Sequence, residues 1–205
     1  MSEALYSISK IAQILKAEAF LTNQNVFIRK LLTDSRTVID PMGSLFFAIK
    51  AQRDGHHFIA NAYENGIRNF VISDSGYQEQ YPNANFLVVD NVLLALQKLA
   101  TSHRNDYNLP VIGITGSNGK TIVKEWLYQL LAADFNIVRS PKSFNSQIGV
   151  PLAVWAIAPE NDLGIFEAGI SRNDEMEALA TIIKPSIGIL TNIGEAHAEG
   201  FKNKQ

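Results

Sequence analysis

The segment Val111–Thr121 constrains the fold of this chain more strongly than any other. It reads VIGITGSNGKT, an apolar run that leads into a glycine-rich turn and then into Lys120 and Thr121. The residues after the turn place apolar side chains at helical spacing. A strand, a glycine turn and an amphipathic helix in this order are typical of a β–α unit whose turn binds phosphate.

The chemistry of phosphate binding requires this order of residues. Gly116 and Gly119 allow the backbone to turn tightly and to point N–H groups inward. The N-terminus of the following helix adds N–H donors and a positive dipole. Lys120 is expected to neutralise the terminal phosphates of a nucleotide, and the Thr121 hydroxyl to bind Mg²⁺. The predicted nucleotide-binding residues are Gly116, Ser117, Asn118, Gly119, Lys120, Thr121 and Ile122.

The loop departs from the common pattern G-x-x-x-x-G-K-[ST]. Counting back from Gly119 places the first glycine of that pattern at Ile114, whereas glycines stand at 113 and 116. A plain glycine turn that closes a β–α unit is therefore an alternative. The strand before the loop and the helix after it favour the phosphate-binding interpretation.

Strand-like and helix-like patterns alternate on both sides of a polar segment, Asn105–Pro110. After it, the expected strands are continuous apolar runs, typical of a parallel sheet covered on both faces. We expect an α/β chain: a small mixed α/β domain over residues 1–106, then a parallel-sheet P-loop domain over 107–205, incomplete at its C-terminal end. Expected strands are Ser44–Ile49, Phe70–Ser73, Phe86–Val89, Val111–Thr115, Asn136–Val138, Leu163–Glu167 and Ile187–Asn192. Expected helices are 8–15 with Ser7 or Ser9 as cap, Phe58–Glu64, Val92–Arg104, Thr121–Ala133 with Val123, Trp126, Leu127, Leu130 and Leu131 inward, Gln147–Ala156 and Asp174–Ile183.

Composition excludes several classes of function. The 205 residues include no cysteine, which excludes disulfides, thiolate metal sites and a cysteine nucleophile. The formal net charge is −2, and the basic residues are scattered, so no nucleic-acid partner is expected. The N-terminus lacks a signal-peptide pattern, and no apolar run is long enough for a membrane span. We therefore expect a soluble, cytoplasmic protein.

Several motifs, in order along the whole chain, resemble those of the Mur ligase family. The loop TGSNGKT has the family's form, although Ile122 stands where most members carry threonine. Lys124-Glu125 and Ser143–Leu152 (SFNSQIGVPL) are similar to the F-type members, whereas E-type members carry a Thr-Thr-Pro segment at the latter position. Further resemblances are TDSR at 33–36, LFFAI at 45–49, DGHHFI at 54–59, FEAGI at 166–170 and TNIGEAHAEGF at 191–201.

The resemblance implies an ADP-forming amide ligase of peptidoglycan precursor synthesis, with ATP and Mg²⁺ as cofactors. ATP would phosphorylate a carboxylate of UDP-N-acetylmuramoyl-tripeptide, and the amine of D-alanyl-D-alanine would displace the phosphate. The implied catalytic residues are Lys120, Asn145 and His197, and the implied metal ligands are Thr121, Glu167 and His197. The implied precursor-binding residues are Ser35, Arg36, His57 and Asn145.

Other parts of the family's site would fall beyond Gln205. They include a lysine, the adenine-contacting residues and the C-terminal domain that binds the incoming amine. We therefore expect a fragment of a longer protein that needs the parent's downstream domains and does not ligate alone.

Simpler interpretations remain for single residues. Glu167 can be a helix-capping or solvated acid, and His197 a surface histidine. Asn145 can be a turn residue, and Asp34-Ser35 an ordinary turn or helix cap. Three other functions also stay open: an E-type ligase that adds a diamino acid, a UDP-precursor-binding module without turnover, and a generic P-loop NTPase. The last is disfavoured because the nearest Walker-B-like apolar strand ends at Glu167, not Asp.

Overall fold

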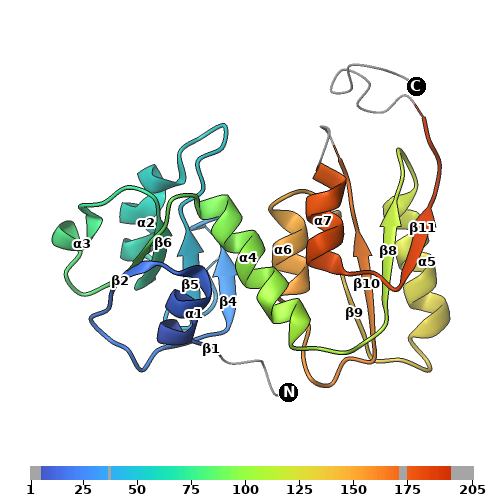
Figure 1. Cartoon of the computed structure of the whole chain (residues 1–205), viewed down its shortest axis with the longest axis horizontal. Helices are drawn as coiled ribbons and strands as arrows, with labels where there is room; N and C mark the ends of the chain where they lie inside the picture. The colour runs from blue at the N-terminus through green and yellow to red at the C-terminus, as the bar shows by residue number, and fades with distance from the viewer. Residues whose placement is uncertain (1–5, 37, 171–174, 195–205) are drawn as a thin grey trace. The chain divides into compact units, whose positions relative to one another are not determined.

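The computed structural model describes residues 6–36, 38–170 and 175–194. The chain forms two compact units that divide within helix α4 (Val92–Asn105), the first ending at Leu99 and the second beginning at Ala100 (Figure 1). This division lies N-terminal to the polar segment at which the sequence places the junction. The assignment of 1–106 to precursor binding and 107–205 to ATP binding stays a prediction. Within the described residues, no helix is long and apolar enough to cross a membrane.

The first unit is a mixed sheet with short helices. Its five strands lie in the order β2-β7-β6-β5-β4, with β2 antiparallel to β7 and the other pairs parallel. The strands are β2 (Glu18–Phe20), β4 (Lys30–Leu32), β5 (Ser44–Phe47), β6 (Asn69–Ile72) and β7 (Asn85–Val88). A separate antiparallel pair joins β1 (Tyr6–Ser7) and β3 (Phe27–Ile28). The helices are α1 (Ile8–Leu15), the 3-10 helix η1 (Gly55–Phe58), α2 (Ile59–Glu64) and α3 (Tyr77–Gln80).

The register of the first sheet builds its core. Phe46 on β5 pairs with Phe70 on β6, which pairs with Phe86 on β7, so three buried rings stand side by side. The ring centroids of Phe70 and Phe86 are 5.2 Å apart in a stacked arrangement. Ile59 and Ala62 of α2 pack against this row. The expected cap of α1 is confirmed, because Ser7 Oγ accepts a hydrogen bond from the Lys10 N–H at 3.2 Å.

The second unit contains the predicted parallel sheet. Its order is β11-β8-β10-β9, and every pair is parallel. The strands are β8 (Val111–Thr115), β9 (Ile137–Arg139), β10 (Leu163–Glu167) and β11 (Ile187–Leu190), and the helices are α5 (Lys120–Leu131), α6 (Gly149–Val154) and α7 (Glu175–Ile183). Figure 1 shows α6 and α7 on one side of this sheet and α5 on the other. The sheet is therefore covered on both faces, which confirms the sequence prediction.

The buried face of α5 differs from the prediction. Val123, Leu127 and Leu131 pack against the sheet, but Trp126 is 64% exposed and Leu130 is 74% exposed. The expectation that both point inward was wrong. At about 100° per residue, the stripe at 123, 127 and 131 leaves Trp126 and Leu130 on the flank of the helix.

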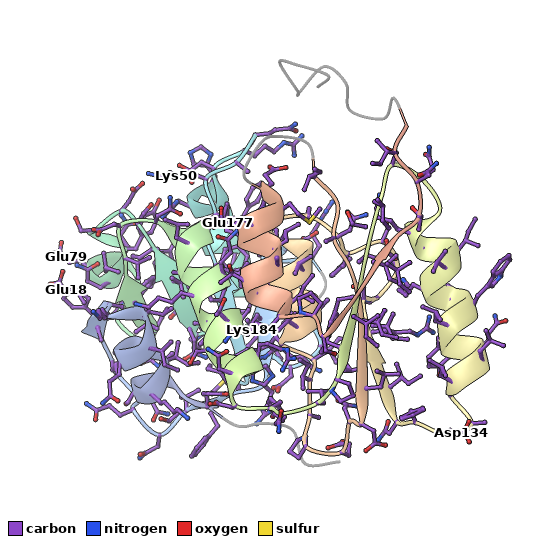
Figure 2. The ribbon with its side chains drawn as sticks, turned by 45° about the vertical axis from the view of Figure 1, so that its right-hand side comes forward. Glu18, Lys50, Glu79, Asp134, Glu177 and Lys184 are labelled. Carbon is purple, nitrogen blue, oxygen red and sulfur yellow. The ribbon has the colours of Figure 1, made fainter. Side chains whose placement is uncertain are left out.

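Charged side chains mostly point outward, as Figure 2 shows for Glu18, Glu79 and Asp134. Among the described residues, Arg104, Lys124 and Glu167 are the buried Lys, Arg, Asp and Glu side chains. Such groups are almost never fully buried without partners. Two of the three lie beside the glycine loop, and these carry the candidate site.

His103 on α4 is buried between two aromatic rings in the second unit. Its ring centroid lies 4.7 Å from that of Trp155 and 5.0 Å from that of Tyr107. Nε2 lies 3.0 Å from the Ile157 carbonyl oxygen, which can only accept, so Nε2 carries the proton. Burial lowers the pKa of His103 to about 4, against 6.5 for an exposed histidine.

This pKa shift predicts a loss of stability in mild acid. Between pH 6.5 and 4 the unfolded chain binds a proton at His103 that the folded chain excludes, so stability falls as the pH is lowered. From pH 7.5 to pH 5.0 this histidine should account for a loss of about 2 kcal/mol in the free energy of unfolding. Urea unfolding of the wild type and of His103→Gln at both pH values measures it. An equal loss in the two proteins would contradict the assignment.

Candidate active site

The carboxyl ends of β8, β10 and β11 meet at one edge of the parallel sheet, where open α/β sheets bind ligands. The glycine loop follows β8 and leads into α5. Gly116 has φ 131 and Gly119 has φ 82, conformations that favour glycine. A Cβ atom on Gly116 would lie 2.1 Å from Thr191 Oγ1. Both the backbone conformation and the space available therefore require glycine at position 116.

The chain after β11 holds the loop in place. The Ser117 N–H donates to the Asn192 carbonyl oxygen (3.0 Å), and the Asn118 N–H donates to Asn192 Oδ1 (2.9 Å). The Gly194 N–H donates in turn to Ser117 Oγ at 2.8 Å. Asn192 thus fixes the glycine loop by accepting hydrogen bonds from two of its N–H groups. The first N–H groups of α5, from Lys120 onward, have no intrahelical acceptor and offer donors for an anion.

Thr121 and Glu167 are brought together beside the loop. Thr121 Oγ1 donates to Glu167 Oε2 at 3.0 Å, and Glu167 is fully buried at the end of β10. Two neighbouring oxygen ligands of an octahedral Mg²⁺, each at ~2.1 Å, are themselves about 3.0 Å apart. The two side chains therefore fit a magnesium site in donor type and spacing. Lys120 lies at the same place, with Nζ 2.5 Å from the Gly116 carbonyl oxygen.

A second lysine on α5, Lys124, is fully buried behind Glu167. Its Nζ lies 2.9 Å from Glu167 Oε1 and 3.2 Å from Glu125 Oε1. The contact with Glu167 is an ion pair outside good hydrogen-bond geometry, since Oε1 accepts no hydrogen bond within the described part of the chain. Burial alone would raise the pKa of Glu125, but hydrogen bonds from Arg139 and Lys124 outweigh it and lower that pKa.

Asn145 lies next to the segment that follows β10. Its carbonyl oxygen accepts a hydrogen bond from the Gly169 N–H at 2.7 Å. A Cβ atom on Gly169 would stand 3.0 Å from Asn145 Cγ, so a larger residue there would press on this side chain. The predicted Asn145 and Glu167 thus occupy the same sheet edge. The predicted His197 lies outside the described residues.

The first unit contains a cavity of about 690 Å³. It is lined by Thr33, Asp34, Ser35, Arg36, Arg53, Phe58 and Asn61. Two predicted residues, Ser35 and Arg36, therefore share one cavity with Arg53 and Asn61, which sequence reasoning missed. The Ser35 hydroxyl donates to Asn61 Oδ1 at 2.7 Å. His57 is exposed and is not among the lining residues.

Asp34 stabilises the turn that carries Arg36, one of the two arginines that line this cavity. Asp34 Oδ1 accepts from the Arg36 backbone N–H at 3.0 Å, and the Arg36 guanidinium lies 2.6 Å from Asp34 Oδ2. The hydrogen bonds from Arg36 lower the pKa of Asp34. The alternative of an ordinary turn therefore applies to Asp34.

His56 is a structural link rather than a ligand. Its Nε2 accepts a hydrogen bond from the Ser73 N–H at 3.0 Å, so the proton sits on Nδ1, 2.6 Å from Asp54 Oδ1. Asp54, His56 and Asp74 are close enough to suggest a metal site. Both ring nitrogens of His56 are already engaged, and Asp74 pairs with Lys50 at 2.6 Å. Protein groups therefore already occupy the atoms that a metal ion would need as ligands.

Comparison with known proteins agrees with this geometry. Residues 114–205 match the family model of the Mur ligase middle domain. UDP-N-acetylmuramoyl-tripeptide--D-alanyl-D-alanine ligase of Bacillus subtilis (strain 168) is 31% identical over 203 residues, covering 97% of this chain and 43% of the relative.

Two solved structures share the fold across most of the chain. A crystal structure of MurF from Acinetobacter baumannii is 27% identical with a TM-score of 0.88, over 99% of this chain and 44% of that one. MurF ligase from Thermotoga maritima in complex with ADP is 29% identical with a TM-score of 0.71, over 82% and 38%. The chain spans less than half the length of these relatives. By the glycine loop, by the carboxylate beside it and by these matches, residues 114–205 are a Mur ligase middle domain, and the chain as a whole is similar to Mur ligases of the F type.

Proposed function

We propose that the protein carrying this chain is an F-type Mur ligase, which adds D-alanyl-D-alanine to UDP-N-acetylmuramoyl-tripeptide in the cytoplasm and forms ADP. The observation that carries the proposal is the pair of oxygens from Thr121 and Glu167, 3.0 Å apart beside the glycine loop. A loop that binds phosphate next to two magnesium-ligand side chains is suited to phosphoryl transfer, which depends on positioning and charge neutralisation.

In this proposal the sheet edge of the second unit activates the precursor's carboxylate. The N–H groups at the start of α5 and the Lys120 ammonium hold the terminal phosphates of ATP. Thr121 and Glu167 hold Mg²⁺, which supplies positive charge against the phosphate oxygens. Asn145, beside Gly169 at the same edge, orients the carboxylate toward the transferred phosphoryl group. The catalytic and metal-binding roles of His197 rest on the family resemblance.

The cavity of the first unit is the proposed site for the UDP end of the precursor. Arginine presents a planar fork of donors that matches phosphate oxygens, and this cavity contains Arg36 and Arg53. Ser35 and Asn61 supply neutral polar groups on its wall. The role of His57 rests on the family resemblance alone.

The F-type assignment is supported by the Ser143–Leu152 segment and by the names of the relatives. The test is ADP release by the full-length protein with Mg²⁺ and ATP. We expect turnover with UDP-N-acetylmuramoyl-tripeptide plus D-alanyl-D-alanine, and none with the dipeptide precursor plus a diamino acid. The reverse result would identify an E-type ligase, and tight precursor binding without ADP release would identify a binding module.

The chain of 205 residues should bind the precursor and ATP but should not ligate by itself. Acceptor binding and the remaining catalytic groups are assigned to downstream domains, because the chain covers 43% of its Bacillus subtilis relative. D-alanyl-D-alanine-dependent ADP release by this chain alone would contradict that expectation.

A further inference from the structure

Lys124 is a charged side chain on the buried side of α5, where side chains are usually apolar. It is 0% exposed and lies at the edge of the stripe of Val123, Leu127 and Leu131 that packs against the sheet. A buried ammonium is costly unless its partners offset the loss of water. An apolar side chain of similar volume often serves stability as well as a buried ion pair does. The burial of a charge here therefore calls for a role beyond packing.

The ammonium group of Lys124 joins three segments of the second unit. It pairs with Glu167 Oε1 at the end of β10, at 2.9 Å. It donates to the carbonyl oxygen of Ser140, just after β9, at 2.9 Å, and also to the carbonyl oxygen of Lys142. Lys142 has φ 50, a left-handed conformation that non-glycine residues seldom adopt. The contact with Lys124 helps to offset that unfavourable backbone conformation.

The two oxygens of Glu167 are thereby assigned different partners. Oε1 faces Lys124, and Oε2 faces the Thr121 hydroxyl. Ser140 reinforces the arrangement, because its Oγ accepts from the Glu167 N–H at 3.1 Å. The turn at 140–142 leads on to Asn145, whose carbonyl oxygen accepts from the Gly169 N–H. One buried cation thus orients the carboxylate and anchors the turn that leads to Asn145.

We propose that Lys124 is a positioning residue for the magnesium site: it holds Glu167 with Oε2 directed at Thr121 and holds the 140–142 turn against the same sheet edge. The inference rests on the proposed function, because it assumes that Thr121 and Glu167 bind Mg²⁺. Groups behind a metal's ligands commonly set metal affinity by orienting those ligands. Lys124 is expected to act on the metal's affinity and not on the nucleotide directly.

The experiment titrates Mg²⁺ into the full-length protein with a fluorescent ATP analogue and records nucleotide binding, so it needs no turnover. Lys124→Met should raise the Mg²⁺ concentration for half-maximal binding about tenfold or more. Nucleotide binding in EDTA should change by less than about twofold. Lys142→Met is the matched control, because the carbonyl of Lys142, and not its side chain, contacts Lys124. It should leave the Mg²⁺ titration unchanged.

Two further variants separate this inference from the proposed function. Glu167→Gln should abolish the Mg²⁺ response. The double variant Lys124→Met/Glu167→Gln should respond as Glu167→Gln does, because Lys124 acts through Glu167. If Lys124→Met fails to fold, Lys124→Gln takes its place in the Mg²⁺ titration, because a neutral amide can still donate to the Ser140 carbonyl oxygen but carries no charge toward Glu167.

The outcomes are distinct. A loss of the Mg²⁺ response in Glu167→Gln with a normal response in Lys124→Met would overturn the role of Lys124 and leave the proposed metal site standing. A Mg²⁺ response in the double variant, where Glu167→Gln alone shows none, would also overturn it. A normal response in Glu167→Gln would overturn the metal site and this inference together.

Discussion

Replacing Lys120 with alanine in the full-length protein should lower kcat/KM for ATP about a thousandfold, equivalent to about 4 kcal/mol of transition-state stabilisation. Lys120 Nζ lies inside the glycine loop, 2.5 Å from the Gly116 carbonyl oxygen, where it can meet the terminal phosphates. Charge on the transferred phosphoryl group has to be neutralised in place, and a lost cation at that point is costly. Steady-state ADP release at varied ATP measures the effect.

Lys98→Ala is the control for this prediction. Lys98 is an exposed lysine of the first unit whose Nζ contacts the Leu15 carbonyl oxygen. Its removal should change kcat/KM by less than about twofold, as is usual for surface substitutions. A Lys120→Ala protein that keeps a tenth or more of the wild-type value would show that the glycine loop does not bind the transferred phosphate.

Arg104→Ala should destabilise the second unit by about 4 kcal/mol, because it leaves several buried acceptors without donors and opens a cavity. Arg104 is buried, and its guanidinium donates to four carbonyl oxygens. They belong to Tyr107 (2.8 Å), Ile183 (2.9 Å), Lys184 (3.2 Å) and Leu109 (3.3 Å). Urea unfolding of the wild type and the variant measures the difference in free energy.

Arg104→Lys is the matched variant. Lysine keeps the positive charge but lacks the planar fork of five N–H donors, so it cannot reach all four carbonyls. Its stability should lie between those of the wild type and Arg104→Ala. A loss below about 1 kcal/mol for Arg104→Ala would mean that water satisfies these carbonyls as well as arginine does.

The second unit was the more predictable part of the fold. The strands Val111–Thr115 and Leu163–Glu167 were expected at the residues where β8 and β10 occur, because buried parallel strands read as continuous apolar runs. The first unit was harder. Its strands β2 (Glu18–Phe20) and β4 (Lys30–Leu32) were not expected, since they are short and include exposed charged residues. They form by pairing with β7 and β5, which local sequence does not reveal.

The candidate site was predictable where topology alone decides position. Thr121 comes after β8 and Glu167 ends the neighbouring parallel strand β10, so their meeting at one edge could be expected. Lys124 could not be placed in this way. A lysine on a helix is usually exposed, and its burial here depends on Glu167 and on carbonyls from a distant turn. Arg53 and Asn61 share the cavity of Ser35 only because separate segments fold together, and no spacing rule predicts that.

The hydrogen bonds between the glycine loop and Asn192 couple the conformation of the loop to that of the chain after β11. The N–H groups of Ser117 and Asn118 donate to Asn192, and the N–H group of Gly194 donates to Ser117 Oγ. A ligand that changes the conformation of the loop would therefore also displace the segment that follows β11. If the loop binds a nucleotide, the conformation of the segment from Asn192 to Gly194 should therefore differ between the bound and the free protein.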